Sequence, residues 1–511
     1  METDPRTGLQ WGVGAALWVA SLVAVAPLIG VSPLAVAADA VIVATPGAVA
    51  TAAIDTFGKT AQPLLMASLG VAVIAGAALA GTLVGRAPER RRKVGSGRFL
   101  APAVAVALYW ESTVPPQIVG VVGAAATALP PLLYARLDRK AARSGTDHAR
   151  RGALRRAAAG VGAVGVLGGV AAGGQAAGYG VDAERAGTAL PNAKERTGRT
   201  VGTPNTGDGV AERTEGELGF DFGGMPPQVE PVEDHYVVDI NTQDPTVDSE
   251  NWNLSVTGAV ENEYDLSFDE LLDHPDAVSV PVTMLCISNP VGGDLISTTT
   301  WRGVPIDSLL EEAGVREGAV DLVTKAVDGY SEAVPVEVAR EEDMFLMFGA
   351  DGDTLSATHG FPARLLIPGR YGMKSTKWVE EIELSTESHT AYWERRSWDE
   401  EAVVNTISYA RAAAVQGDAA AVGGISYAGN RGIQRVEVSL DGGETWGDAE
   451  LEDAASEHTW RRWRYVFERE GRENVTATVR ATDGTGTVQT EERTSNHPDG
   501  STGWHEETFE L

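Results

Sequence analysis

The segment around the only cysteine of this 511-residue chain has the residue types of a metal-ligand loop. An apolar, β-branched run, Val278–Ile287, carries Cys286 into a turn that reads Ser-Asn-Pro-Val-Gly-Gly. Glycine in such a turn lets the backbone approach a ligand closely. A thiolate is a soft donor, which suits a soft metal better than a carboxylate or an imidazole does. A buried structural thiol is the commoner fate of a lone cysteine, and it stays open as the alternative.

A second segment concentrates positive charge in a strongly acidic part of the chain. Residues 359–377 hold one His, two Arg and two Lys, together with one Ser and one Thr, on Gly-flanked bends. Arginine forks, lysine ammonium groups and hydroxyls are donors that recognise a phosphate or a similar anion. The alternative is a set of solvated surface cations.

Several classes of site are excluded by the cysteine count. One cysteine allows no intramolecular disulfide, no Cys-rich zinc site, no Cys-ligated iron–sulfur cluster and no covalent c-type haem. No Walker loop occurs, and the only Gly-x-Gly-x-x-Gly pattern, at residues 160–165, lies inside an apolar stretch.

The net charge of -30 is divided unevenly along the chain. Residues 1–180 hold 16 of the 41 Lys and Arg and 8 of the 71 Asp and Glu, a net of +8, so the remainder carries -38. Such an acidic half should repel nucleic acid and needs screening of its own charges, which predicts a halophile. An ordinary acidic protein is the alternative.

The first 180 residues predict a membrane anchor of about five helical spans. The apolar stretches are Trp11–Leu34, Ala61–Val84, Phe99–Ser112, Pro116–Tyr134 and Ala157–Tyr179. Basic clusters at residues 86–98 and 136–156 should lie in cytoplasmic loops, which puts everything after the last span outside the cell membrane. Arg155-Arg156 before the last span resembles a signal that exports folded proteins, or it simply belongs to the basic loop. No span carries a histidine that could hold a haem.

The remainder predicts a flexible acidic linker and two folded domains. Residues 181–224 are rich in Gly, Thr, Asp and Glu and cannot bury enough apolar surface to order themselves. Residues 225–400 mix strands and helices irregularly, which favours an α+β fold. The expected elements there are strands at Asn253–Val260, Val278–Ile287 and Val379–Leu384, and helices at Ser267–Leu272 and Val304–Ala313.

Residues 401–511 read as an all-β domain. Strands are expected at Gly432–Leu440, Trp460–Phe467 and Val475–Ala481, with hairpin turns at Asp441-Gly442 and Asp483-Gly484. Their spacing predicts an immunoglobulin-like β-sandwich without chemistry of its own.

Residues from about His235 to Trp504 resemble the sulfite oxidase family of molybdopterin enzymes, and more closely its membrane-anchored members. The resemblance rests on motifs in a shared order, with a tail similar to the family's dimerisation domain. The motifs are Cys286-x-Ser-Asn, Trp301-Arg-Gly-Val-Pro, Val327-Asp-Gly-Tyr-Ser, His359-Gly-x-Pro-x-Arg, Ser375-Thr-Lys-Trp, Arg480-Ala-Thr-Asp-Gly and Pro498-Asp-Gly-x-x-Gly-Trp.

The resemblance implies a molybdenum–molybdopterin cofactor (Moco) whose metal is bound by Cys286. It implies that His359 and Arg364 bind the pterin and its phosphate, with Ser375, Thr376 and Lys377 closing over it. Three further residues are expected to bind the cofactor but match the family less well. They are Asp239 and Asn241, in a strand expected at residues 236–241, and Asp328. Arg302, Tyr330, Tyr371 and Lys374 lie close enough in sequence to these motifs to line the substrate mouth, and Lys374 is also expected to bind the cofactor.

The chain departs from the family pattern where sulfite oxidases hold their anion. Pro290 and Val291 stand where arginines are expected, Val238 replaces another arginine, and Phe348 replaces the active-site tyrosine. Sulfite itself is therefore doubtful as the substrate.

We accordingly expect an extracytoplasmic oxidoreductase that transfers an oxygen atom to or from a small oxyanion or oxide in a two-electron reaction. Electrons would pass to or from a separate carrier such as a cytochrome or copper protein, and the last domain would form a homodimer. Two alternatives are a sulfoxide reductase on the same scaffold and a membrane-tethered interaction protein without a cofactor.

Overall fold

The computed structural model describes residues 218–241 and 244–511, together with isolated positions between 41 and 72 and between 186 and 190. The chain divides into two compact units, one made of residues 1–44, 59–181 and 240–243, and the other of the remainder. The five predicted spans, Arg155-Arg156 and most of the predicted linker lie outside the described residues. Among the residues that are described, no helix is both long enough and apolar enough to cross a bilayer.

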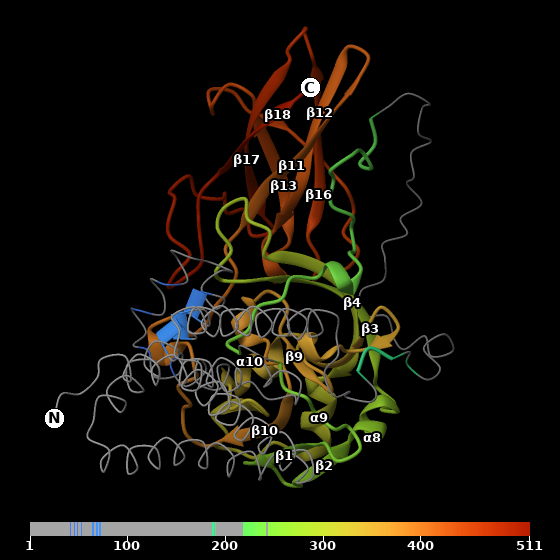
Figure 1. The fold of residues 1–511 in the computed structure, drawn as a ribbon, viewed down its shortest axis with the longest axis vertical. Coiled ribbons are helices and arrows are strands. Elements are labelled where there is room, and N and C mark those ends of the chain that lie inside the picture. Colours follow the sequence, from blue (N-terminus) through green and yellow to red (C-terminus); the bar gives the residue numbers. More distant parts are fainter. Residues whose placement is uncertain are drawn as a thin grey trace, which may run out of the picture. The chain divides into compact units, whose positions relative to one another are not determined.

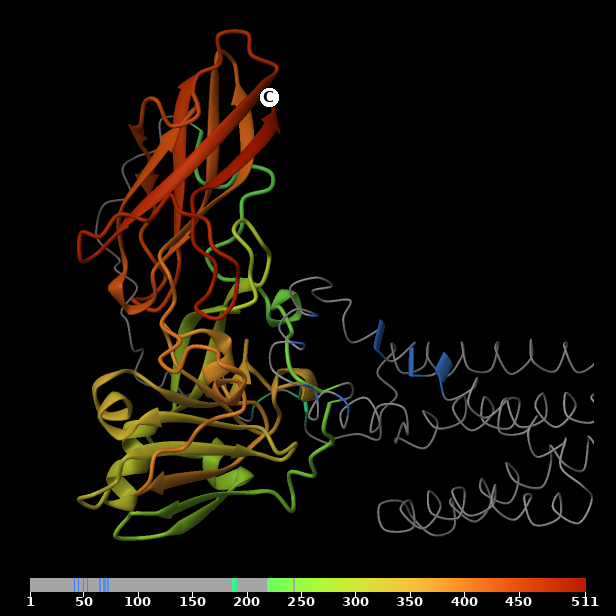
Figure 2. The same ribbon diagram turned by 90° about the vertical axis from the view of Figure 1, so that its left-hand side faces the viewer.

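The domain that follows the linker contains two five-stranded sheets with three short helices (Figures 1 and 2). The first sheet has the order β2-β1-β10-β5-β6, in which only the β1–β10 pair is parallel. Its strands are β1 (Asn253–Gly258), β2 (Tyr264–Ser267), β5 (Asp321–Ala326), β6 (Ser331–Pro335) and β10 (Val379–Ser385). The helices are α8 (Phe268–Leu272), α9 (Ile306–Ala313) and α10 (Val336–Glu341).

The second sheet is antiparallel and carries the cysteine. Its order is β3-β4-β7-β8, with β9 paired to β7. The strands are β3 (Val278–Leu285), β4 (Ile296–Pro305), β7 (Phe345–Ala350), β8 (Asp353–Thr354) and β9 (Arg364–Leu366). Leu285 pairs with Ile296, so the connection between β3 and β4 begins at Cys286. The α+β prediction is thereby confirmed.

Two local predictions in this domain have different outcomes. The Ser267–Glu270 capping box forms as expected: the Ser267 hydroxyl accepts from the Glu270 N–H and the Glu270 carboxylate accepts from the Ser267 N–H. The predicted helix start at Val304 is wrong, because Val304 pairs with Leu346 of β7 and extends β4. Helix α9 begins only at Ile306, with Pro305 as its N-cap.

The C-terminal domain packs two antiparallel four-stranded sheets around their own core, so the β-sandwich prediction is confirmed (Figure 1). One sheet has the order β11-β12-β16-β15 and the other β14-β13-β17-β18. The strands are β11 (Ile407–Gln416), β12 (Ala419–Tyr427), β13 (Ile433–Ser439), β14 (Gly447–Asp448), β15 (Glu450–Leu451), β16 (Arg461–Glu468), β17 (Asn474–Asp483) and β18 (His505–Glu510). The immunoglobulin-like identity of the sandwich remains a prediction.

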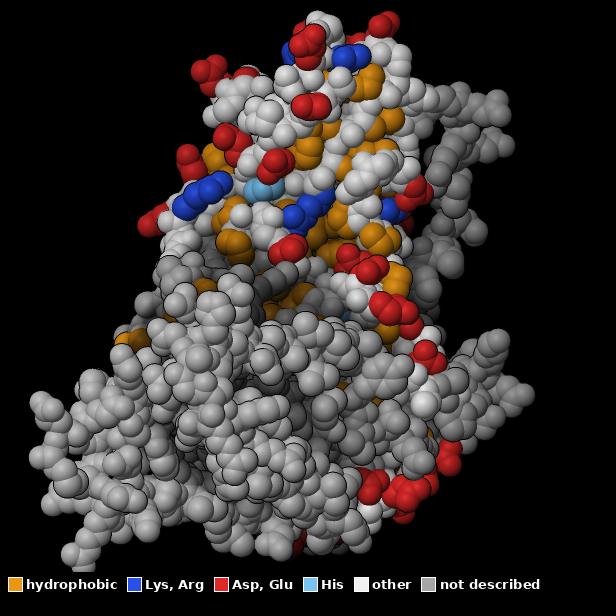
Figure 3. All heavy atoms as spheres, viewed as in Figure 1, with side chains coloured by type: hydrophobic (Ala, Val, Ile, Leu, Met, Phe, Trp, Pro, Cys, Tyr) orange, Lys and Arg blue, Asp and Glu red, His pale blue; other side chains and the backbone are white. Residues whose placement is uncertain are grey.

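Acidic side chains are scattered over the surface of the described part, as the charge count requires (Figure 3). Separate apolar cores fill the two domains, and a third cluster joins them. This third cluster includes Leu285 and Ile287, which flank the cysteine, and Tyr409 and Tyr427 of the sandwich. The cysteine therefore lies where the two domains are packed together.

Candidate active site

Cys286 lies at the end of β3, with only 6% of its surface exposed. Its N–H donates to the Leu295 carbonyl at 3.0 Å, which continues the β3–β4 ladder by one position. Its carbonyl accepts from the Asn289 N–H at 3.0 Å and closes a turn. The backbone of Cys286 is thus fixed from both sides, which holds the side chain in a defined position.

The loop after the cysteine is held by the C-terminal domain. The Asn289 amide nitrogen donates to the Tyr409 hydroxyl at 3.1 Å, and the Ser501 hydroxyl donates to the Asn289 carbonyl at 2.7 Å. Arg411 donates through its two terminal nitrogens to the carbonyls of Gly292 and Gly293. All of these donors and acceptors in the sandwich lie more than a hundred residues downstream of the loop.

Gly292 shows how closely the two domains approach at this loop. Its φ is +78°, and a Cβ added there would lie 2.3 Å from Nε2 of His505. Only glycine fits both the left-handed backbone and this contact.

A buried guanidinium without a carboxylate lies in the same domain. Arg364 begins β9, is 3% exposed, and stacks on the Trp301 ring at 5.2 Å. It donates to the carbonyls of His359 and Ser375, both at 3.3 Å, whereas its Nε has no hydrogen-bond partner in the described part of the chain. Burial lowers the pKa of Arg364 to about 10. Since no described carboxylate compensates this charge, the position favours an anionic ligand.

Two histidines border this guanidinium. The rings of His235 and His359 lie edge to face at 5.7 Å, and His235 also contacts Trp301 at 5.1 Å. Burial, reinforced by the charges of Arg364 and Lys377, lowers the pKa of His359 to about 4 and that of His235 well below its usual range. Both imidazoles are therefore neutral near pH 7. His359 Nε2 is 3.1 Å from the Val232 carbonyl and must carry the proton there, because a carbonyl only accepts.

Lys377 and Asp239 form a buried ion pair next to these groups. The Lys377 ammonium is 2.9 Å from an Asp239 carboxylate oxygen and donates to the Thr358 carbonyl at 2.8 Å. Desolvation lowers the pKa of Lys377 even though Asp239 opposes it. The Lys377 charge adds to the positive potential around Arg364, because it also lowers the pKa values of both histidines.

Tyr236 connects the cysteine to the basic cluster. Burial raises its pKa well above the usual range, the Cys286 charge raises it further, and the Arg364 charge opposes this increase. The Tyr236 ring is stacked on His235 at 5.2 Å, and its hydroxyl has no hydrogen-bond partner in the described part of the chain. A Cβ added at Gly372 would lie 3.0 Å from the Tyr236 hydroxyl and 3.7 Å from the Leu285 carbonyl, so the phenol that senses the Arg364 charge also lies beside the residue before Cys286.

The site fits a polar, anionic cofactor with a soft metal. Three buried polar atoms around it lack a partner among the described residues: the Tyr236 hydroxyl, the indole nitrogen of Trp301 and Nε of Arg364. Such atoms are rare in folded proteins and call for an explanation. A group that brings hydrogen-bond acceptors and negative charge would satisfy all three, and Cys286 offers the thiolate for its metal.

Tyr371 belongs to the same apolar cluster as Leu285 and Ile287, which flank the cysteine, and burial raises its pKa to about 12. Its catalytic role stays a prediction. Its hydroxyl accepts from the Asn405 N–H at 3.1 Å. A Cβ at Gly500 would overlap the same hydroxyl, so the phenol is covered by the C-terminal domain.

Tyr330 and Lys374 are placed in a different buried cluster. The Lys374 ammonium donates to Glu332 at 2.8 Å, to Glu394 at 2.7 Å and to the Ala333 carbonyl at 3.1 Å, which uses all three of its hydrogens. The Tyr330 hydroxyl contacts the Glu332 carboxylate and the Met373 carbonyl. We correct the prediction that these two side chains face a substrate or a phosphate, because their polar atoms are occupied within the protein.

Three other predicted residues have structural contacts. The Asp328 carboxylate accepts from the Tyr330 N–H at 2.9 Å in the β5–β6 turn. The Thr376 hydroxyl pairs with that of Thr324 at 2.7 Å, and the Ser375 hydroxyl accepts from the Ile367 N–H. Their roles toward a cofactor stay predictions, and so does that of Asn241, which belongs to the other compact unit.

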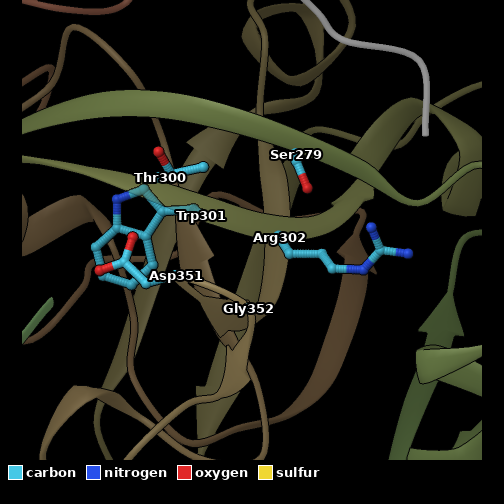
Figure 4. Close-up of a pocket in the computed structure, with 6 residues that line it drawn as sticks. All are labelled: Ser279, Thr300, Trp301, Arg302, Asp351 and Gly352. Atoms are coloured by element: carbon cyan, nitrogen blue, oxygen red, sulfur yellow. The ribbon is translucent and has the colours of Figure 1, made fainter. Parts of the chain in front are cut away.

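Arg302 points away from the basic cluster. Trp301 and Arg302 leave β4 in opposite directions, and Figure 4 shows the guanidinium extending away from the indole. The guanidinium lies 5.9 Å from the ring centre of Phe348. Trp301 and Arg302 line a cavity of about 350 Å³ together with Ser279, Thr300, Asp351 and Gly352. Arg302 pairs with Ser279, whereas Cys286 follows Leu285 six positions further along β3, so the placement of Arg302 at the mouth of the Cys286 site is wrong.

Sequence reasoning missed His235, Tyr236 and Trp301 as members of the site. Residues 236–241, expected as a strand, have no regular structure where they are described, and the aromatic rings instead stack beside Arg364. A usable signal was the His-Tyr pair directly before the segment that carries Asp239.

Comparisons with known proteins agree with this geometry. Residues 241–393 match the oxidoreductase molybdopterin binding domain, and residues 382–505 match the Mo-co oxidoreductase dimerisation domain. The nitrate reductase [NAD(P)H] of Hordeum vulgare is 28% identical over 289 residues, which cover 44% of this chain and 32% of that protein. The nitrate reductase [NADH] of Spinacia oleracea is 27% identical over 288 residues, with 43% and 30% covered.

The chain spans about a third of the length of these curated relatives. Among solved structures, the sulfane dehydrogenase SoxCD of Paracoccus pantotrophus aligns with a TM-score of 0.47 and 22% identity, over 56% of this chain and 81% of that one. The two adjoining domain matches, together with the thiol and the basic cluster, identify this chain as a molybdopterin-dependent oxidoreductase of the sulfite oxidase family, with a molybdenum–molybdopterin cofactor.

Proposed function

We propose that this protein is an extracytoplasmic enzyme that moves an oxygen atom to or from a small oxide or oxyanion and exchanges the two electrons with a separate carrier. The observation that carries the proposal is a group of three buried polar atoms without a partner in the described chain, the Tyr236 hydroxyl, the Trp301 indole nitrogen and Nε of Arg364, in the domain that also buries Cys286. The match to the oxidoreductase molybdopterin binding domain excludes the alternative of an interaction protein without a cofactor.

Each residue of the site has a definite task in this proposal. Cys286 binds the metal, and Arg364 binds the anionic part of the pterin through the nitrogen that has no partner in the described chain. The neutral imidazoles of His235 and His359 offer hydrogen bonds without adding charge. When bound, the cofactor supplies the two-electron oxygen-atom transfer, while the protein orients it and excludes water.

The surroundings of the cysteine favour a neutral oxide over sulfite as the substrate. Pro290 and Val291 follow the cysteine and offer no charge, and Val291 packs against the apolar cluster that contains Ile287 and Trp398. Arg411, which reaches the same loop, donates to two backbone carbonyls. A sulfoxide or an N-oxide loses less hydration than sulfite on entering such surroundings. Nitrate is a second candidate, since the curated relatives are named nitrate reductases.

The remaining parts of the proposal come from the sequence and the domain matches. The apolar stretches before residue 180 and their basic loops support a multi-pass anchor in the cell membrane, with residues 181–511 outside. The dimerisation-domain match over residues 382–505 supports a homodimer. The electron partner would be a cytochrome or a small copper protein.

The proposal is tested on the full chain, produced in a host that makes the cofactor. We expect about one molybdenum per chain, and loss of both metal and activity in Cys286→Ser. Ser279→Ala is the control, because Ser279 lies on the same strand but lines the cavity next to Arg302. The substrate panel compares oxidation of sulfite with reduction of methionine sulfoxide, dimethyl sulfoxide and nitrate by a reduced viologen. A Cys286→Ser protein that keeps its molybdenum would overturn the assignment of Cys286 as the metal ligand. Turnover of sulfite and of no other compound in the panel would overturn the proposal of a neutral substrate.

A further inference from the structure

One histidine that does not belong to the group of active-site residues above has both ring nitrogens buried and without a hydrogen bond in the described part of the chain. His458 lies in the loop between β15 and β16 and is 2% exposed. Neither Nδ1 nor Nε2 has a hydrogen-bond partner among the described residues. A buried imidazole without any partner loses its hydrogen bonds to water and gains none in the protein, which costs about 1–3 kcal/mol. The ring therefore requires a ligand or another compensating group.

Two carboxylates face this imidazole from two different domains. Glu457 precedes the histidine in the sandwich, and Asp343 lies between α10 and β7 of the molybdopterin domain. One ligand atom from each of the three residues lies within 4.8 Å of the others. His458 Nε2 is 3.3 Å from an Asp343 oxygen, although the direction is wrong for a hydrogen bond.

The separation of these two atoms is that of two ligands on one metal ion. Ligands at 2.0–2.1 Å from a tetrahedral zinc ion lie about 3.3 Å apart. The two carboxylates are exposed, so water can complete the coordination sphere. A further negative charge is near, because Asp343 helps to raise the pKa of Asp307.

We propose that Asp343, Glu457 and His458 bind a divalent transition-metal ion, with zinc as the best match for one imidazole and two carboxylates. The loop that carries His458 is attached to β3: the Thr283 N–H donates to the His458 carbonyl at 3.0 Å, and the Ser456 hydroxyl donates to the Pro281 carbonyl at 2.6 Å. The ion would therefore connect the sandwich to the domain whose strand β3 leads to Cys286.

The test uses the full-length, molybdenum-containing protein after treatment with a chelator and dialysis. Zinc is added and measured per chain by elemental analysis, and its affinity is measured by calorimetry. We expect one strong site per chain in the wild type. Loss of an outer-shell partner typically weakens metal binding about 10–100-fold, so Asp343→Asn or Glu457→Gln, which removes a direct ligand, should weaken it about 100-fold or more. Zinc should also raise the thermal midpoint of the wild type but not of these variants.

Two further variants separate this site from other sources of binding. Asp307→Asn is the matched control, since it removes a neighbouring carboxylate that is not a ligand, and it should keep the zinc site. Cys286→Ser should lose molybdenum and keep zinc. The proposal fails if the wild type binds no zinc above background, or if Asp343→Asn and Glu457→Gln bind as tightly as the wild type. Because both carboxylates are exposed, these variants decide the question even if His458→Gln does not fold.

Discussion

Replacement of Arg364 by methionine tests whether this guanidinium stabilises the folded apoprotein or binds the cofactor. Burial lowers the pKa of Arg364 from 12.5 to about 10, which at 1.36 kcal/mol per pKa unit makes the charged form about 3 kcal/mol less favourable in the folded chain than in the unfolded one. The folded pKa is the lower one, so this penalty is fully present below about pH 10 and disappears only as the pH rises toward 12.5. At neutral pH it acts in full.

The variant also removes two stabilising contacts. Arg364 donates to the carbonyls of His359 and Ser375 at 3.3 Å, which is long for a hydrogen bond. Hydrogen bonds from a charged group contribute about 1.5–3 kcal/mol each, and long ones lie at the lower end. The two contacts therefore offset the desolvation penalty, and Arg364→Met in the apoprotein should stay within about 1–2 kcal/mol of the wild type.

Lys374→Met is the matched control, because Lys374 is just as buried but is paired with Glu332 and Glu394. Its removal leaves two buried carboxylates without their cation and should cost about 3–5 kcal/mol. The measurements are the urea midpoint of both apoproteins and the molybdenum content after expression in a host that makes the cofactor.

Arg364→Met should hold about 10–100-fold less cofactor, the loss expected for one charge-assisted hydrogen bond of about 1.5–3 kcal/mol from the Nε that has no partner in the described chain. An apo Arg364→Met protein that is destabilised as strongly as Lys374→Met, or a variant that retains its molybdenum, would contradict the assignment of Arg364 to the cofactor.

Three further predictions concern pH, loop geometry and salt. The pKa of His359 falls from 6.5 to about 4 on folding, so the contribution of this histidine to the free energy of unfolding should be fully present above pH 6.5 and decline by up to about 3 kcal/mol as the pH drops to 4. His359→Gln should flatten this part of a profile of thermal midpoint against pH, and an unchanged profile would contradict the prediction. Gly292→Ala combines a φ of +78° with a clash against His505 and should lower both the thermal midpoint and the molybdenum content. Gly318→Ala, with a φ of +91° and open space, should lower the free energy of unfolding by only about 1–2 kcal/mol and keep the metal. Raising NaCl from about 0.1 to 1 M shortens the Debye length from about 10 to 3 Å and should raise the thermal midpoint of so acidic a protein; a constant midpoint would argue against the predicted halophile.

The parts of the fold that local sequence determines could be predicted. The apolar run before Cys286 and the turn residues after it gave strand β3 and its loop, and Ser267 with Glu270 gave the start of α8. The hairpin turn at Asp441 needs only the local preference of Asp and Gly. In each case the controlling residues are neighbours in the chain, so the pattern carries the structure.

The wrong predictions come from partners far away in the chain. Val304 looks like a helix start, but its backbone pairs with Leu346 of β7. Lys374 looks like a phosphate-binding residue within its segment, yet its partner Glu332 comes from β6, 42 positions earlier. The resemblance places Arg302 near the substrate, but strand alternation turns it to the other side of β4 from Trp301. Tertiary pairing of this kind cannot be seen in a single sequence.

The hold of the C-terminal sandwich on the cysteine loop sets an order of events during synthesis. The groups that fix Asn289 and Gly292 lie 119 to 212 positions downstream, so they are still inside the ribosome or not yet made when Cys286 emerges. The metal-ligand loop can reach its final shape only after translation of the last domain. Insertion of the cofactor must then follow translation of that domain, and a chain truncated before β11, which lacks Tyr409, Arg411 and Ser501, should be unable to retain molybdenum.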